Sequence, residues 1–467
     1  MSNGLQKGII VILLLFCLLP TENIAAVELD FLSKEEIKKM GQEVEKIQIR
    51  KTHEEAPSIS YPYQLGKVDE SLLHQAIQGT NFVRRLAGLP GDVIINQDLN
   101  DLAQHGALLL AASQDFSHNP KRPADMDEEL YKKGYQSTSS SNISYGRDNL
   151  WANIRDGYMP DTGHNIDEVG HRRWILNPPL QKTGFGLVAG NGTMQVFDQS
   201  RQEQVEYDYI AWPVSSFPSE IFKGDHPWSV SLNPDKYQAP DVNDVQVVLA
   251  REYDNKQWVF DHEDNNISSM NNYFTVDNQN FGINNAIIFR PKGISRYVGK
   301  YKVKITGIRN LNGEPVPVEY EVDFFSMDNY FSKGEKELIK IGIILESDYA
   351  YLFNQEDQIE LYHDRPFIYR NHTMVPLRLI TEYLKMNVSW DQESGEIEIT
   401  EGNTIIKLQA NSEQAFINDQ LYHLDVEPQI INGVTFVPVR FISEGLGAKV
   451  DWNHKENKVT ISRIYTH

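Results

Sequence analysis

The chain has 467 residues, and its 44 Lys+Arg against 65 Asp+Glu give a formal net charge of −21. This acidity argues against nucleic-acid binding and against electrostatic attachment to anionic lipid, because both need clustered cations. The hydrophobic share of 40% is enough for packed cores, and the length suggests about three domains.

The first 26 residues have the layout of a secretory signal peptide. Lys7 precedes an apolar run over 8–19, and Ala25-Ala26 offers a small-residue cleavage site. The run has 12 residues, against the roughly 20 that a membrane-spanning helix needs. An uncleaved anchor is the alternative, and no other segment of the sequence is long and apolar enough to cross a membrane.

The only cysteine, Cys17, lies inside this apolar run. The exported chain would therefore contain no cysteine, which excludes thiol catalysis. Export without disulfides is more typical of a bacterial secreted protein than of a eukaryotic one. We therefore expect a secreted, extracellular protein, with association with the cell wall left open.

Residues 27–65 predict a leader helix and a linker. Ser33 and Glu36 form a capping-box pattern, and apolar residues then recur with helical spacing over 33–51. Pro57 and Pro62 indicate a linker over 52–65.

Residues 66–200 begin with two apolar helical stripes and end in short strands with Gly-rich turns. A polar stretch over 137–144 between them is typical of a loop. This order predicts an α+β unit or a layered α/β/α unit.

Residues 201–330 change character, with short strand-like runs separated by Asn- and Gly-rich turns and no long helical stripe. This pattern predicts an antiparallel β-sandwich. Residues 331–353 then resemble a connector.

Residues 354–467 contain an internal repeat. Thr373-Met-Val-Pro-Leu-Arg378 recurs as Thr435-Phe-Val-Pro-Val-Arg440, and 12 of 35 positions are identical between 366–400 and 428–462, at a constant offset of 62. The identical positions are mostly apolar, which indicates core positions. Each copy predicts a strand, a short helix and a β-hairpin, so the chain as a whole predicts a multidomain fold.

Several motifs over 66–188 resemble those of the CAP superfamily (cysteine-rich secretory protein, antigen 5 and pathogenesis-related proteins). Asn81-Phe-Val-Arg84 is similar to its first-helix signature, and Phe116-Ser-His118 to the histidine that ends its second helix. Gly170-His-Arg-Arg-Trp-Ile-Leu-Asn-Pro178, followed by Gly184-Phe-Gly186, is similar to a block of the bacterial members. The resemblance assigns the CAP-like domain to 66–200.

The resemblance implies an α/β/α sandwich with a cleft in which two histidines and two acidic residues can bind a divalent metal. His118 and His171 match the two histidines. Ser141, followed by Asn142, stands where the family has its first glutamate, which puts the metal in question. Asp156 or Asp161 is the nearest candidate for the second acid.

A local pattern offers another donor set. His164, Glu168 and His171 are spaced i, i+4, i+7, and would share one face if 164–172 were helical. Two imidazoles and a carboxylate suit Zn²⁺ or another divalent metal. The alternative is that His164 and Glu168 are surface residues in an insertion. Arg172 and Arg173 are candidates for binding an anionic ligand at the cleft, against the alternative of a solvated or salt-bridged pair.

The repeated Thr-x-Val-Pro-x-Arg…Trp pattern over 355–463 resembles the tandem module named after the N-terminal domain of copper amine oxidases, a stalk-like domain. Copper amine oxidase activity is not expected, because the sequence lacks the three histidine ligands and the Asn-Tyr-Asp/Glu segment that supplies the quinone.

Three functions remain open at this stage. The first is a secreted, modular envelope protein with a CAP-like head that binds an envelope polymer or protein. The second is a metal-dependent hydrolase of peptide or wall polymer, with His118 and His171 as ligands and Glu168 as ligand or catalytic base. The third is an apolar-ligand (lipid) binder, which the polar segment over 121–146 disfavours. The ligand and the oligomeric state are not predicted.

Overall fold

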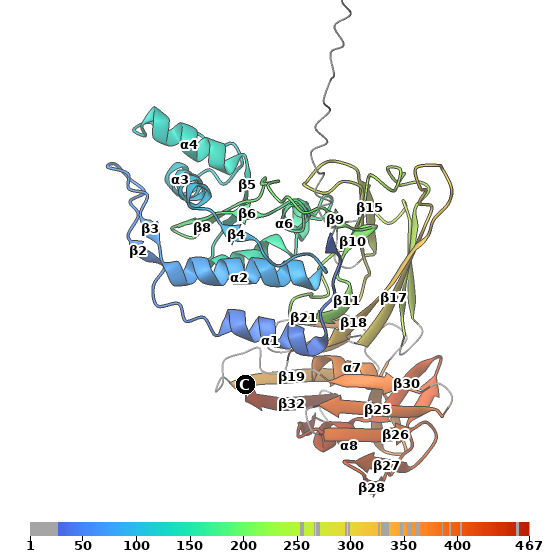
Figure 1. Cartoon of the computed structure of the whole chain (residues 1–467). Coiled ribbons are helices and arrows are strands. Elements are labelled where there is room, and N and C mark those ends of the chain that lie inside the picture. The colour runs from blue at the N-terminus through green and yellow to red at the C-terminus, as the bar shows by residue number, and fades with distance from the viewer. Residues whose placement is uncertain are drawn as a thin grey trace, which may run out of the picture.

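The computed structural model describes residues 27–466, apart from 253–255, 266, 268–270, 295–296, 298, 326, 328–335, 346–348, 353–356, 361–364, 385, 392–393, 402–403 and 454–456. The predicted signal peptide lies outside the described residues. Figure 1 shows a helix-rich head beside a β region, with a C-terminal unit below both. Among the described helices, none has the length and apolar character needed to cross a membrane.

The leader (27–65) packs on its neighbours. Helix α1 (Lys34–Glu45) begins at Ser33, whose hydroxyl accepts the N–H of Glu36 while the Glu36 carboxylate accepts the N–H of Ser33, so the predicted capping box is present. The helix lies against α2 (Glu70–Leu86). Strand β1 (Val27–Glu28) pairs with β9 (Val205–Glu206), and β2 (His53–Glu55) with β3 (Lys67–Val68). The predicted linker therefore contains a strand that pairs with the start of the head.

The head (66–200) has helices on both faces of a small sheet of order β5-β8-β7. The polar stretch predicted as a loop instead ends one helix and begins strand β5. Its remaining elements are β4 (Ile94–Ile95), α3 (Gln97–Ser113), α4 (Glu128–Thr138), β5 (Ser141–Tyr145), α5 (Leu150–Asn153), a π-helical turn η1 (Ile154–Tyr158), a 3₁₀ turn η2 (Gly163–Asn165), α6 (Gly170–Ile175), β6 (Lys182–Thr183), β7 (Phe185–Val188) and β8 (Asn191–Gln195).

The Gly-x-Gly motif at β7 has a steric reason. A Cβ at Gly184 would lie 2.1 Å from the Leu99 carbonyl carbon, and one at Gly186 would lie 2.4 Å from that of Ala103, so only glycine lets α3 approach this face. Phe185, between them, points to the opposite face and joins the apolar core that contains Phe82 of α2.

The β region (201–330) contains two sheets, of order β10-β12-β16-β15 and β11-β18-β17-β13-β14. Trp228 of the first sheet contacts Phe324 of the second with ring centroids 5.8 Å apart, so the sheets pack face to face. The strands are β10 (Tyr209–Trp212), β11 (Ser215–Pro218), β12 (Trp228–Leu232), β13 (Gln246–Arg251), β14 (Gln257–Phe260), β15 (Tyr273–Asp277), β16 (Ala286–Arg290), β17 (Gly299–Thr306) and β18 (Val318–Phe325).

One edge departs from the predicted antiparallel sandwich, because β11 and β18 run parallel. The chain crosses from β10 in one sheet to the edge of the other, where β11 meets β18. The core of the β region is continuous with that of the head, since one apolar cluster contains buried residues of both.

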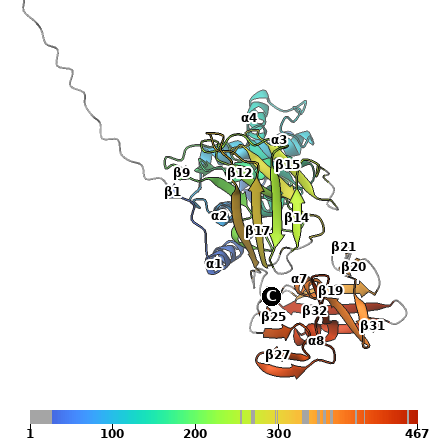
Figure 2. The same ribbon diagram turned by 90° about the vertical axis from the view of Figure 1, so that its right-hand side faces the viewer.

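The C-terminal unit (336–466) has its own core and lies below the other parts in both views (Figures 1 and 2). Its first half contains β19 (Lys336–Ile344), β20 (Tyr349–Leu352), β21 (Asp357–Glu360), β22 (Phe367–Tyr369), β23 (His372–Pro376), α7 (Leu377–Tyr383), β24 (Asn387–Trp390) and β25 (Glu396–Glu401). Its second half repeats this order as β26 (Thr404–Gln409), β27 (Gln414–Ile417), β28 (Gln420–His423), β29 (Gln429–Ile431), β30 (Val434–Pro438), α8 (Val439–Gly445), β31 (Lys449–Asn453) and β32 (Lys458–Thr466).

The prediction of a connector over 331–353 is wrong for its described residues, because β19 and β20 occupy most of them. β19 pairs with β32, and β26 pairs with β25, so each half completes its sheet with the last two strands of the other half. The halves also meet about a local twofold axis, where Val375 of β23 faces Val437 of β30.

Candidate functional site

A cavity of about 350 Å³ opens between the head and the β region. Its polar lining consists of His118, Ser139, Ser141, Asn142, Asn165, Glu168, Gly170 and His171. Its aromatic lining consists of Trp174, Phe197 and Phe281. The structure thus brings together five of the residues singled out in the sequence, and leaves His164, Arg172 and Arg173 outside the lining.

His171 is held by a buried carboxylate. Its Nδ1–H donates to Asp161 Oδ1 at 2.6 Å, and the second oxygen of Asp161 accepts the N–H of Arg172 at 2.8 Å. The Asp161 side chain is fully buried, whereas the His171 side chain is 19% exposed. Because Nδ1 carries the proton that Asp161 accepts, Nε2 remains for a ligand in the cleft.

Two charged groups of the cleft have shifted pKa values. Burial opposes protonation of His171, but the carboxylates of Asp161 and Glu168 outweigh it and raise the His171 pKa above its usual value. Burial and the nearby charges of Asp277 and Asp167 raise the pKa of Glu168. The protonated form of His171 is therefore favoured in the cleft relative to a free imidazole.

The backbone around this pair is strained. Asp161 has φ +47°, and Val169, directly before α6, has φ +43°. A β-branched residue in the left-handed region is unusual and persists only when its surroundings hold it. Val169 is fully buried and packs in one cluster with Tyr273 and Ile288 of the β region.

Hydrogen bonds engage the side chains of both His118 and Ser141, and the Ser141 hydroxyl also lies 3.5 Å from that of Ser137. His118 Nδ1–H donates to the Thr138 carbonyl at 2.7 Å, which leaves Nε2 available. Ser141 is buried, and its hydroxyl accepts from the Gln195 amide at 2.7 Å. Ser141 makes no hydrogen bond to either imidazole, so no histidine-activated serine is assembled here.

The helix over 164–172, on which the second donor set depended, does not form. Residues 163–165 make a 3₁₀ turn and α6 begins at Gly170, so His164, Glu168 and His171 do not share one helical face. Glycines at 163 and 170 are poor helix formers, which explains the break. Among the described residues, no three His, Cys, Asp or Glu side chains converge as a metal site. Ser141 and the engaged Asp161 leave a donor set that does not fit Zn²⁺.

Arg172 and Arg173 are not cleft residues, contrary to the prediction. Arg172 is fully buried, and its guanidinium donates to carbonyls on both sides of the boundary, those of Met159 and Pro160 in the head and Pro227 in the β region. Burial lowers the Arg172 pKa to about 10.

Arg173 crosses the same boundary. It donates to the Ile283 carbonyl at 2.9 Å and pairs with the buried carboxylate of Asp277. Both arginines therefore fasten α6, and with it His171, to the β region.

The aromatic lining comes from three separate segments. Trp174 is three residues after His171 on α6, so both side chains share one helical face. Its ring stacks on Phe197, with centroids 4.1 Å apart and planes at 30°. Phe281 comes from the β region and packs against Gly170, where a Cβ would lie 2.8 Å from its ring. The i, i+3 spacing of His171 and Trp174 is readable from the sequence, whereas nothing there points to Phe281.

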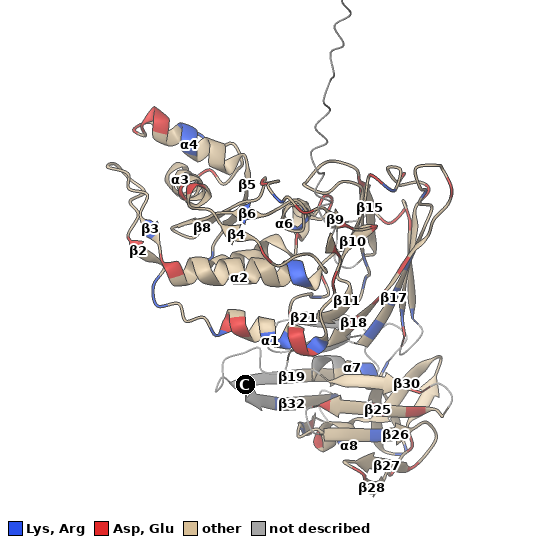
Figure 3. Ribbon diagram, viewed as in Figure 1, with Lys and Arg blue, Asp and Glu red and all other residues tan. Residues whose placement is uncertain are grey.

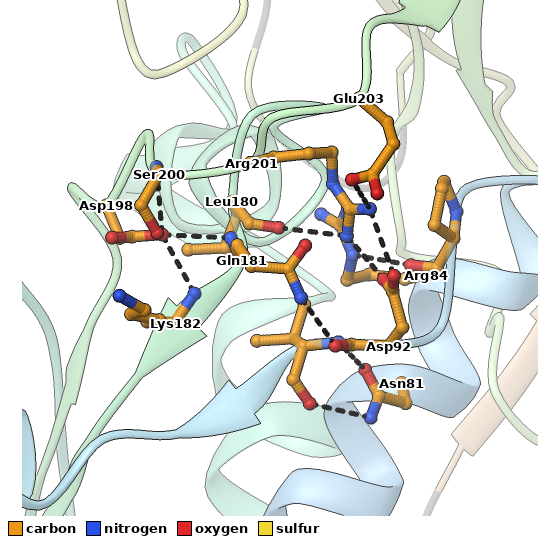
Figure 4. Close-up of polar contacts among 12 residues, drawn as sticks. Asn81, Arg84, Asp92, Leu180, Gln181, Lys182, Asp198, Ser200, Arg201 and Glu203 are labelled. Atoms are coloured by element: carbon orange, nitrogen blue, oxygen red, sulfur yellow. Dashed lines mark hydrogen bonds and ion pairs between the residues drawn. The ribbon is translucent and has the colours of Figure 1, made fainter. Parts of the chain in front are cut away.

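A buried polar network supports these elements (Figure 4). Arg84 Nη1 donates to the carbonyls of Ile175 and Asn177 at 2.8 Å each, where α6 ends. Burial lowers the Arg84 pKa to about 9, and the charge of Arg201 acts in the same direction. Asn81 exchanges two hydrogen bonds with the Val93 backbone. The motif Asn81–Arg84 of the first helix thus holds two backbone segments in place, one at Val93 and one at the end of α6.

The same network anchors the segment that follows Phe197. Asp198 accepts the backbone N–H groups of Gln181 and Lys182 at 2.9 and 2.8 Å. Arg201 pairs with Asp92. Phe197 is therefore held in the cleft wall by fixed backbone on its C-terminal side.

Two regions of the chain match known families. Residues 78–197 match the cysteine-rich secretory protein family, CAP, and residues 354–461 match the copper amine oxidase N-terminal domain. A protein from Brevibacillus choshinensis named "Protease inhibitor" is 35% identical over 89 residues, which are 19% of this chain and 26% of that protein. The chain therefore spans about a quarter of that relative's length, and no solved structure matches it. The chain contains a CAP domain followed by a copper amine oxidase N-terminal domain.

Proposed function

We propose that this chain is a modular binding protein, and that the CAP domain and the β region together hold its ligand in the cleft between them. The observation that carries the proposal is the composite lining, in which Phe281 of the β region faces the same cavity as His118 and His171 of the head. Buried arginines fasten this boundary, so the cleft is a preorganised site.

The groups in the cleft favour recognition over metal-activated hydrolysis. Two imidazoles offer their Nε2 atoms, and Glu168 supplies a carboxylate. Ser141 replaces the glutamate that the family resemblance leads us to expect, and Asp161 is already bound to His171. These groups suit hydrogen bonding to a polar ligand.

We further propose that the protein is secreted and acts at the cell envelope, with an envelope polymer or protein as its ligand. The apolar run over 8–19 supports export. Acidic residues are spread over all three parts (Figure 3), so anionic wall polymers would not retain the chain by simple charge attraction. A relative named for protease inhibition is compatible with a protein ligand.

Cosedimentation of the purified full chain with isolated Gram-positive cell walls tests this function. We expect binding, and we expect His118→Trp to reduce the bound fraction, because an indole at this exposed position fills the cleft. Tyr61→Trp is the matched control, since Tyr61 is 75% exposed on the leader. Absence of binding, or equal binding by His118→Trp and the wild type, would overturn the proposal.

A further inference from the structure

The cleft presents an aromatic platform to solvent. Phe197 is 47% exposed although its ring is apolar, and it lies stacked on Trp174. Exposed apolar rings are more often solitary. In this stacked pair each ring covers one face of the other, so the outer face of Phe197 is the flat apolar surface that the pair offers.

Hydrogen bonds on both sides fix the positions of the two aromatic residues. Trp174 is on α6, whose C-terminal carbonyls Arg84 caps. The residue after Phe197 is Asp198, whose carboxylate accepts two backbone N–H groups of the neighbouring segment (Figure 4). A rigid ring loses little conformational entropy when a ligand binds against it.

The rest of the lining is polar but carries no lysine or arginine. It offers hydroxyl, amide and imidazole groups, among them Ser139, Asn165 and His118, and the carboxylate of Glu168. A lipid chain would leave these groups without partners. An anionic polymer would find no lysine or arginine to offset its charge. The volume, about 350 Å³, is near the lower end of the roughly 300–1,000 Å³ of small-molecule sites.

We propose that the cleft binds a neutral sugar unit of a glycan chain, with one pyranose face against the outer face of Phe197, which Trp174 supports from behind. A pyranose presents C–H groups on its faces and hydroxyl groups around its edge, which matches a flat apolar wall beside polar side chains. The inference rests on the proposed binding function and specifies its ligand class. Phe197 is then a specificity residue, because it supplies a face that a linear peptide backbone does not use.

Calorimetry on the full chain tests this with two probes, an N-acetylglucosamine trimer and the peptide Ala-Tyr-Ala. We expect the sugar to bind and Phe197→Leu to weaken it about tenfold, because leucine keeps the apolar character and loses the flat face. Phe197 is half exposed, so this change spares the fold. Tyr145→Leu is the matched control, since Tyr145 also packs on an exposed ring, that of Phe116, but lies outside the cavity lining.

Each outcome bears on the proposal. Sugar binding that falls with Phe197→Leu but not with Tyr145→Leu supports it. Sugar binding that Phe197→Leu leaves unchanged overturns it. Binding of the peptide alone overturns the sugar assignment and leaves the binding function standing, as does cell-wall binding with neither probe bound. If the walls and both probes fail to bind, both proposals fail.

Discussion

The head and the β region are joined in a different way from the two halves of the C-terminal unit. The first junction uses one continuous apolar core and two buried arginines that donate to backbone carbonyls across the boundary. The second uses strand pairing, since the sheet of each half includes the last two strands of the other half. The cavity described above lies at the first junction.

Buried arginines and paired strands join two parts of a chain with different consequences for the space between them. Backbone ladders align two segments along their whole length and leave no space between them. Arginines reach across a boundary at a few points, and the surfaces around those points are free to form a cleft. The head and β region therefore share one core, whereas the C-terminal unit has a core of its own.

The largest effect is expected from a substitution that disrupts the pairing of β19 with β32. Ile461 of β32 is fully buried and faces Ile341 of β19. Ile461→Asp places a charge in this core and should cost more than about 4 kcal/mol of unfolding free energy. Scanning calorimetry should show the loss of a C-terminal transition with the head transition unchanged.

Ile399→Asp at the equivalent position of β25 should have the same effect. A shift of the head transition by either variant would contradict the separation of the two units.

A smaller effect is expected at the arginine junction. Arg173→Leu leaves the buried Asp277 carboxylate and the Ile283 carbonyl without their partner. Breaking such a buried pair costs about 3–5 kcal/mol. Thermal unfolding of the head and β region should shift together, because they share one core. Lys304→Leu removes an exposed ion pair with Glu319 and should leave the transition in place. Separate transitions in Arg173→Leu would show that the core alone does not couple the two parts.

The smallest expected effect concerns pH. The His171 pKa is raised, so the Asp161 pair contributes its full stability below about pH 6.5 and loses it as the pH rises through the folded-state pKa. Asp161→Asn should lower the unfolding free energy by about 1–3 kcal/mol at pH 6 and by less at pH 9. Urea unfolding across this range checks the difference.

Asp101→Asn is the control for this pH dependence, since Asp101 approaches His105 at 3.6 Å from an exposed position. A difference between wild type and Asp161→Asn that grows with pH would reverse the assigned sign.

The order of the modules was readable from the sequence because it rests on local patterns. The capping box at Ser33 and the 62-residue offset are such patterns. The start of the first repeat was missed because Ile341 and Ile343 of β19 match Ile406 and Leu408 of β26 at an offset other than 62. The local sequence alone does not identify such a strand, because its place in the sheet depends on pairing with β32, which lies far along the chain.

The site was predicted in part. His118 and His171 were found from their motifs, and both line the cavity. Arg172 and Arg173 were expected at the cleft but lie buried beside it. The sequence does not show which backbone carbonyls will surround an arginine. Phe281 has no local signal at all, since its role depends on how the β region meets Gly170.

The pairing of β19 with β32 sets a condition on folding. Ile341 and Ile461 are partners in one ladder although 120 positions separate them. Such a long closure lowers the folding rate, because loop entropy is lost before the contact forms. Until β32 arrives, one edge of β19 has no strand beside it, and an open apolar edge invites pairing with other chains. The slowest event in the folding of the C-terminal unit is therefore expected to be the meeting of its first strand and its last.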